Sequence, residues 1–247
     1  MQSTFSYADF PRRLNLGCGF DLRAGYLNVD LQPWHKPDLI ADVGELDFLP
    51  AGYYEEILAQ DVLEHLPRTS TCKILVHWNR LLAPEGVLRL RVPNVLAILK
   101  RLASRRNQAV AKQEELIQFL FGTQAYTGDF HFTSFTEVLL THYLRSTGYD
   151  VVGIKTMDDG NFDATSRKVR SVHPHDVGDF SDLLSIERDE DFVRECYRSI
   201  LKREADVEGV NYYVSSLAQG RMVRGAVIDL MFNSDERKGL ARIHSTR

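Results

Sequence analysis

Two short stretches decide the fold of this chain: Arg13-Leu14-Asn15-Leu16-Gly17-Cys18-Gly19 and, six residues later, Tyr26-Leu27-Asn28-Val29-Asp30. The first predicts a buried strand that ends in two glycines, and the second predicts a neighbouring strand that ends in an acid. Glycines at the carboxyl end of a strand let the backbone approach a ligand closely, and the acid can accept hydrogen bonds from both hydroxyls of a ribose. Together they predict a nucleoside pocket. The alternative is an ordinary glycine turn followed by a solvated aspartate, with no ligand.

The connection between the two strands restricts the nucleoside ligand. Phe20 to Gly25 is too short for a full crossover helix between parallel strands, so the first strand-helix unit is abbreviated. A dinucleotide fingerprint also needs a third glycine, three residues after the second, to open a helix whose N-terminus holds the pyrophosphate. Leu22 occupies that position, and the sequence therefore disfavours NAD and FAD.

Strand and helix patterns alternate beyond these stretches. Short strands are predicted at 37–43 and 54–58 and a further strand at 87–92. Between the last two, a helix capped by Thr69, Ser70 or Thr71 is predicted to continue to Leu82. This order implies a mostly parallel sheet covered by helices on both faces.

A long helical pattern and a candidate functional loop follow. Residues 95–122 are predicted to be helical, and 121–132 form a loop rich in glycine, aromatic and hydrogen-bonding residues. The next helix is expected to be capped by Thr133 or Ser134. An antiparallel hairpin within 148–169 completes the sheet.

The character of the chain changes after this hairpin. Residues 171–188 lack periodicity and are predicted to be a linker between a first domain at 1–170 and a second at 189–247. Three apolar helical stripes predict that the second domain is a small all-α unit, which needs close packing against the first domain or a partner. We therefore expect it to bind a protein partner or to self-associate. The acidic turn 206–209 lacks the ligand series of a calcium loop.

Composition restricts the classes of function. The 247 residues are 44% hydrophobic and 26% charged with a formal net charge of -4, values typical of a globular protein that does not bind nucleic acid. The three cysteines are scattered without metal-ligand spacing, so we predict neither a disulfide framework nor a metal site. The stretch 1–11 has no apolar leader and no later run is long enough to span a bilayer, which predicts a cytoplasmic protein.

In their order, the motifs resemble those of class I S-adenosylmethionine-dependent methyltransferases. The resemblance covers residues 10–169 and is carried by Leu14-Asn15-Leu16-Gly17-Cys18-Gly19, Val29-Asp30, Ala41-Asp42-Val43, Gln60-Asp61-Val62-Leu63-Glu64-His65-Leu66 and Leu81-Leu82-Ala83-Pro84-Glu85-Gly86. The abbreviated first unit is similar to a bacterial subgroup that also carries a loop like Gly128-Asp129-Phe130-His131 after the fifth strand. Residues 189–236 resemble a small helical domain of unknown function often appended to bacterial glycan-modifying enzymes.

The resemblance implies a Rossmann-like, mostly parallel seven-stranded sheet with helices on both faces, plus a small all-α C-terminal domain. It implies an enzyme that uses S-adenosylmethionine and releases S-adenosylhomocysteine. In such an enzyme Asp30 would hold the ribose diol by two charge-assisted hydrogen bonds, and Asp42 with the Val43 backbone would meet the adenine. The expected cofactor-binding residues are Gly17, Cys18, Gly19, Asp30, Asp42, Val43, Gln60, Asp61 and His65.

The acceptor is expected at the loop 121–132. Methyl transfer from a sulfonium needs chiefly alignment and exclusion of water, and a hydroxyl acceptor also benefits from a base. We predict that His131 is this base, that Asp129 orients it or binds substrate, and that Tyr126 and Gln124 bind the acceptor. The alternative for His131 is a structural role that ties the loop to the core. Glu64 is interpreted as a charge at a helix N-terminus.

The predicted function is O-methylation of a sugar, a nucleotide sugar or the end of a glycan in cell-surface polysaccharide synthesis. The glycan part depends on the resemblance of the C-terminal domain. Two alternatives stay open. One is a methyltransferase for a small molecule or lipid, with a more apolar acceptor pocket around Phe121, Tyr126 and Phe130; the other is a non-catalytic cofactor-binding scaffold.

Overall fold

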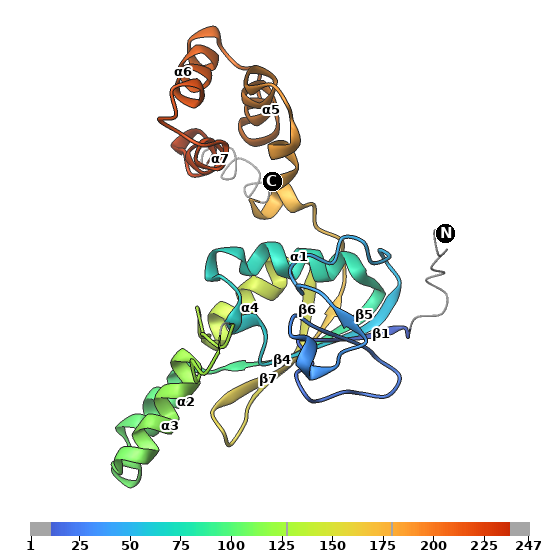
Figure 1. Ribbon diagram of the computed structural model, residues 1–247, viewed down its shortest axis with the longest axis vertical. Helices are drawn as coiled ribbons and strands as arrows, with labels where there is room; N and C mark the ends of the chain where they lie inside the picture. The colour runs from blue at the N-terminus through green and yellow to red at the C-terminus, as the bar shows by residue number, and fades with distance from the viewer. Residues whose placement is uncertain (1–10, 127, 179, 238–247) are drawn as a thin grey trace. The chain divides into compact units, whose positions relative to one another are not determined.

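The computed structural model describes residues 11–126, 128–178 and 180–237, and Figure 1 traces their path. The stretch 1–11, predicted to lack a leader, therefore lies almost wholly outside the described residues. The chain divides into two compact units, Met1–Val172 and His173–Arg247.

The first unit is built on a seven-stranded sheet in the order β3-β2-β1-β4-β5-β7-β6. β1 to β5 pair in parallel, whereas β7 runs antiparallel between β5 and β6. This arrangement confirms the predicted Rossmann-like, mostly parallel seven-stranded sheet. The strands are β1 (Arg13–Leu16), β2 (Leu27–Asp30), β3 (Leu39–Ile40), β4 (Tyr54–Gln60), β5 (Leu82–Pro93), β6 (Tyr149–Thr156) and β7 (Asn161–Lys168).

The strand order reverses direction at β1, which lies between β2 and β4. Leu16 at the end of β1 pairs with Val29 on one side and with Ala59 on the other, so the residues that follow these strands meet at one edge. In an open α/β sheet a switch point of this kind forms a crevice at the carboxyl ends of the strands. The sheet therefore gathers the segments that the sequence singles out.

Two helices cover one face of the sheet. α1 (Thr71–Leu81) and α4 (Glu137–Ser146) pack against each other over this face (Figure 1). The core beneath them contains the fully buried Trp78, whose indole Nε1 donates to the Val43 carbonyl at 2.9 Å. Along β5 the residues alternate between this core and the opposite face, where Arg89 is exposed and Arg91 is half-buried.

The segment predicted as one helical stretch, 95–122, forms a helical hairpin. α2 (Val95–Ala103) begins after Asn94, whose side chain accepts from two backbone N–H groups of the first turn, and α3 (Val110–Phe121) runs back beside it. In Figure 1 this hairpin projects away from the sheet. It returns the chain to the carboxyl edge, where Gly122 ends α3 with a φ of +77°.

The predicted cap of α4 is wrong. The helix is capped by Thr136, whose Oγ1 accepts from the Leu139 N–H at 3.2 Å, instead of by Thr133 or Ser134. Ser134 donates from Oγ to the Pro93 carbonyl at 3.2 Å, and the adjacent Phe135 is buried. The residues before the helix are thus used to fix the chain to the end of β5.

The second unit contains α5 (Asp189–Leu201), α6 (Val207–Ala218) and α7 (Arg224–Phe232) around its own apolar core. Phe180 and Leu183, in the range predicted as a linker, are buried in this core. Two apolar residues outside a regular helix give no periodic signal, which is why this part of the range was not assigned to the helical unit. Within the described ranges no helix combines the length and apolar character needed to cross a membrane.

Candidate functional site

A cavity of about 550 Å³ lies at the carboxyl edge of β1, β2 and β4. Its size falls within the range of small-molecule sites in proteins. Tyr126, predicted on the acceptor side, also lines it. The structure brings together all nine residues predicted for the cofactor in the lining of this cavity: Gly17, Cys18, Gly19, Asp30, Asp42, Val43, Gln60, Asp61 and His65.

The turn after β1 requires glycine at two positions. Gly17 and Gly19 have φ values of +59° and +51°, in the left-handed region that side-chain-bearing residues rarely adopt. A Cβ on Gly17 would also lie 2.4 Å from Cγ2 of the buried Val62. Between them Cys18 is 5% exposed, and burial raises the pKa of its thiol to about 11, so it forms an unreactive part of the wall.

Asp30 is already engaged by the protein. Its carboxylate, in a residue 6% exposed, accepts from the Gly19 N–H at Oδ2 and from the Gln32 N–H at Oδ1, both at 2.8 Å. Nδ1 of His35 lies 3.0 Å from the same Oδ1. A carboxylate offers about four acceptor positions, so when His35 donates only one remains, on Oδ2. Asp30 can then accept one ribose hydroxyl, where the sequence predicted two.

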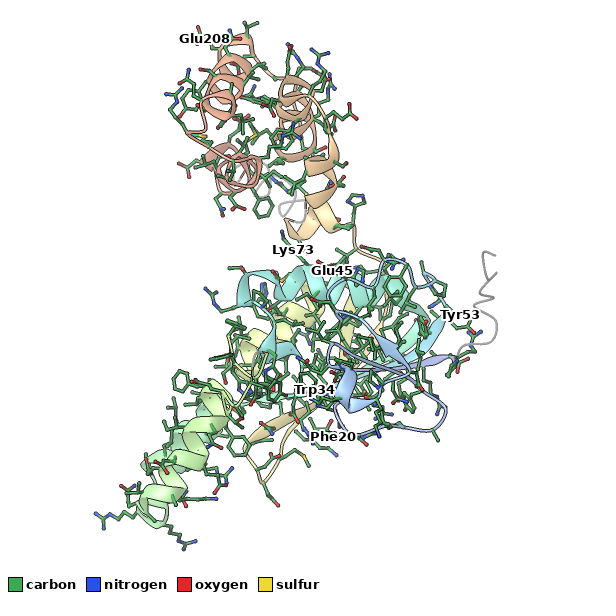
Figure 2. The ribbon with its side chains drawn as sticks, in the orientation of Figure 1. Phe20, Trp34, Glu45, Tyr53, Lys73 and Glu208 are labelled. Carbon is green, nitrogen blue, oxygen red and sulfur yellow. The ribbon has the colours of Figure 1, made fainter. Side chains whose placement is uncertain are left out.

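His35 was missed by the sequence analysis because a single histidine in a loop carries no pattern. Its ring meets two aromatic rings edge-on, with its centroid 4.6 Å from that of Phe20 and 5.8 Å from that of Trp34. Trp34 in turn meets Tyr126 edge-on at 6.2 Å. Phe20 is 79% exposed and lines the cavity, and Trp34 is 54% exposed; both are labelled in Figure 2. Exposed aromatic rings at a cavity are suited to stacking on a flat ring.

The second and third acids differ in how they are held. Asp42 is exposed and accepts from the Gly44 N–H at 2.8 Å, which leaves the rest of its carboxylate open to the cavity. Asp61 has a φ of +54° and forms a bidentate ion pair with Arg91, with Arg91 Nε 2.8 Å from Oδ1. This hydrogen-bonded pair raises the pKa of Arg91. Arg91, a residue the sequence analysis also missed, thus stabilises the unusual backbone at Asp61.

A second cavity of about 350 Å³ shares Asp61 and His65 with the first. The predicted catalytic residues His131 and Asp129 line this second cavity. The remaining side chains around it include Glu64, Glu115, Gln118, Phe119, Thr123 and Asn161. The predicted catalytic residues are therefore next to the first cavity without being part of its lining, whereas the predicted acceptor residue Tyr126 lines the first cavity itself.

His131 was predicted to be oriented by Asp129, but the structure orients it by a hydrogen bond to a backbone carbonyl. Its Nδ1 lies 3.1 Å from the Phe119 carbonyl, which can only accept, so Nδ1 donates and Nε2 carries the free lone pair of the neutral ring. Burial, and next the neighbouring His65, lower the pKa of His131. The carboxylate of Asp129 instead accepts from the Thr123 hydroxyl. Phe119 orients His131, and Asp129 holds the loop.

Gln124 lies apart from the site. Its amide Nε2 donates to the Phe121 carbonyl at 3.3 Å, and it lines neither of the two cavities. Its predicted role in acceptor binding therefore has no support in the geometry.

Glu64 is placed differently from the helix-terminal charge that its position suggested. It lies in the 3-10 turn Leu63–His65 but is 1% exposed, and burial raises the pKa of its carboxyl well above the ordinary value. Its Oε2 has no hydrogen-bond partner among the residues that the structure describes. It lies beside His65 and His131. No spacing rule could find this group, because His131 is far from the other two in sequence.

Comparison with known proteins gives one family match. A profile of a domain of unknown function (DUF4214) matches residues 179–241, in the helical unit. No curated protein matches the chain.

Solved structures resemble about two thirds of the chain. A possible exported protein from Bordetella parapertussis is 15% identical with a TM-score of 0.47, over 64% of this chain and 61% of that protein. The 1,6-didemethyltoxoflavin-N1-methyltransferase of Burkholderia thailandensis, solved with S-adenosylhomocysteine, is 17% identical with a TM-score of 0.43, over 64% and 71%. A SAM-dependent methyltransferase from Methanosarcina mazei is 16% identical with a TM-score of 0.46, over 64% and 92%. These similarities are too low to assign an activity, and the fold rests on the strand order itself.

Proposed function

We propose that the first unit is an S-adenosylmethionine-dependent methyltransferase that acts on a hydroxyl of a sugar, a nucleotide sugar or the end of a glycan. The observation that carries this proposal is the convergence of nine separately predicted cofactor residues on one cavity at the switch point of the sheet. Such a switch point is where open α/β sheets bind their ligands.

The cavity offers groups that fit the parts of S-adenosylmethionine. Backbone at Gly17 and Gly19 would lie against its methionine end; a Cβ on Gly19 has no atom within 4 Å, so a ligand can approach there. Asp30 would accept one ribose hydroxyl at its remaining Oδ2 position. Asp42 with the Val43 backbone would meet the adenine, and Gln60 the amino-acid group. The cofactor supplies a methyl group already activated on a sulfonium.

The second cavity supports a polar acceptor. Its lining offers carboxylate, amide, hydroxyl and imidazole groups, which suit a ligand with several hydroxyls. Phe121 and Phe130, which a more apolar acceptor pocket would use, line neither cavity. Nε2 of His131 is the atom available to receive a proton from an acceptor hydroxyl. The link to cell-surface polysaccharide, and a cytoplasmic site of action, rest on the sequence resemblance alone.

Calorimetric titration of the full chain with S-adenosylhomocysteine tests the cofactor assignment. Asp30→Asn should weaken binding about 10- to 100-fold, because hydrogen bonds to a charged group contribute about 1.5–3 kcal/mol. Asp150→Asn, at an exposed position of β6, is the matched control and should bind like the wild type. Absence of binding by the wild-type chain would overturn the proposal.

Transfer of a radiolabelled methyl group to a cell-envelope extract tests the acceptor. We expect the label in the glycan fraction. Label in the lipid fraction would favour the lipid methyltransferase, and binding of S-adenosylhomocysteine without transfer to any fraction would favour a non-catalytic scaffold.

A further inference from the structure

Glu64, His65 and His131 form a cluster of metal-ligating side chains between the two cavities. One ligand atom from each residue lies within 4.8 Å of those of the other two. All three line the second cavity, and His65 lines the first as well. Ligand atoms around a bound ion at about 2.1 Å are somewhat closer together, so small ring rotations would complete such a site.

Both histidines are held in the tautomer that a metal requires. Nδ1 of His65 lies 3.2 Å from the Phe130 carbonyl, and Nδ1 of His131 lies 3.1 Å from the Phe119 carbonyl. Because a carbonyl only accepts, each Nδ1 donates and each Nε2 keeps its lone pair. Donation of the second ring nitrogen to a backbone carbonyl is the usual way in which proteins orient a metal-binding histidine.

The buried carboxylate of Glu64 is a second, independent indication that a cation binds in this cluster. It is 1% exposed, and its Oε2 has no hydrogen-bond partner among residues 11–126, 128–178 and 180–237. A buried oxygen without a partner is costly, and proteins pair or coordinate such groups. A cation held with His65 and His131 would satisfy it.

We propose that Glu64, His65 and His131 bind a divalent transition-metal ion at the boundary of the two cavities. Two imidazoles and one carboxylate are a ligand set of zinc, iron and manganese sites, whereas magnesium and calcium prefer oxygen ligands alone. With three protein ligands, the ion keeps positions open toward the cavity for water or substrate oxygen.

The role of this ion deepens the proposed function and rests on it. An acceptor hydroxyl bound to such an ion would lose its proton to solvent more readily. Its oxygen would then form the bond to the methyl carbon while the carbon–sulfur bond breaks, and the sulfonium would become a neutral thioether. His131 would in this case be a metal ligand instead of the general base, because its one free lone pair serves only one of these purposes.

Titration of the chelator-treated full chain with CoCl₂, purified without a polyhistidine tag, tests the site. The cobalt absorption spectrum reports coordination, and calorimetry with ZnCl₂ gives the stoichiometry. We expect one equivalent per chain. Glu64→Gln and His131→Gln should each weaken binding at least about 100-fold, beyond the 10- to 100-fold lost when an outer-shell partner is removed.

His142→Gln, at an exposed position of α4, is the control and should bind cobalt like the wild type. Equal affinity of the wild type and Glu64→Gln, or absence of a one-equivalent site, would overturn the proposal. If Glu64→Gln fails to fold by tryptophan emission, His65→Gln and His131→Gln at half-buried positions decide the question. Cobalt is titrated without cofactor and S-adenosylhomocysteine without metal, so the failure of either assignment is seen separately.

Discussion

Replacement of Gly17 by alanine tests the geometry on which the first cavity depends. The residue has a φ of +59°, and a Cβ there would lie 2.4 Å from Cγ2 of Val62. Val62 is buried and β-branched, so it has few ways to move aside. Gly19 gives a matched control two residues later, since its φ is +51° and a Cβ there meets nothing within 4 Å.

The two substitutions should differ in the free energy of unfolding. A left-handed backbone costs a non-glycine residue about 1–2 kcal/mol, and an overpacked methyl about 1–3 kcal/mol more. Alanine also lowers the conformational entropy of the unfolded chain, which offsets about 0.4–1 kcal/mol of the destabilisation in both variants. Gly17→Ala should therefore destabilise the first unit by about 2–4 kcal/mol, and Gly19→Ala by about 1 kcal/mol.

Urea unfolding followed by tryptophan emission measures this difference in the first unit alone. The chain has two tryptophans, Trp34 and Trp78, and both belong to that unit. With a slope of about 2 kcal/mol per molar urea, the midpoint of Gly17→Ala should lie about 0.5–1.5 M below that of Gly19→Ala. Equal midpoints, or a lower midpoint for Gly19→Ala, would refute the reasoning from close packing at Gly17.

Three other outcomes are expected. Iodoacetamide at pH 8 should label the half-buried Cys72 first. Burial raises the pKa of all three thiols, but most in Cys18 and Cys196, to about 11 and about 12. Thiolate fractions of about 0.1% and 0.01% follow for these two cysteines, and mass spectrometry showing early Cys18 labelling would contradict this. Gly122→Ala would place a Cβ 2.1 Å from the Asp129 carbonyl oxygen and should displace the loop that carries His131. Methyl transfer in the radiolabel assay should fall by about 100-fold, because the acceptor would be misplaced. Unchanged turnover would exclude a role for this loop. In the helical unit, Gly209→Ala should lower the melting temperature measured by circular dichroism, since its Cβ would lie 2.0 Å from the Tyr197 hydroxyl. Gly225→Ala, whose Cβ would have no atom within 4 Å, should instead stabilise its helix by about 0.5–1 kcal/mol. Stabilisation by both substitutions would contradict the packing at Gly209.

The first cavity could be predicted in part because several of its residues lie directly after strands. Gly17, Asp30 and Gln60 each end or follow a strand that hydrophobic patterning identifies, and parallel strands bring their carboxyl ends to one edge. Rules for helix capping failed where a tertiary contact used the side chain that they predicted as the cap. Ser134 was a reasonable cap for α4, but its hydroxyl is used by the Pro93 carbonyl at the end of β5.

A functional loop at 121–132 was predicted from the sequence, but the contacts within this loop could not be. The composition of 121–132 indicated a functional loop, yet the partner of His131 is the Phe119 carbonyl, and a backbone atom has no signature in the sequence. His35 and Arg91 escaped for a related reason. Each acts on an aspartate that the sequence did identify, through a side-chain contact that only the folded chain creates.

From the sequence alone followed the abbreviated first unit and the missing third glycine that disfavours a dinucleotide, because both depend on strand ends and glycine positions; the nine residues that line the first cavity were indicated by the resemblance of the motifs to a methyltransferase family. Only the tertiary structure decided that Asp30 keeps one acceptor position, and that Glu64, His65 and His131 meet around a buried oxygen without a partner among the described residues. Strand ends are local features that patterning encodes. Whether a lone pair is already used, and whether a side chain is buried, depends on which distant residues the fold brings into contact.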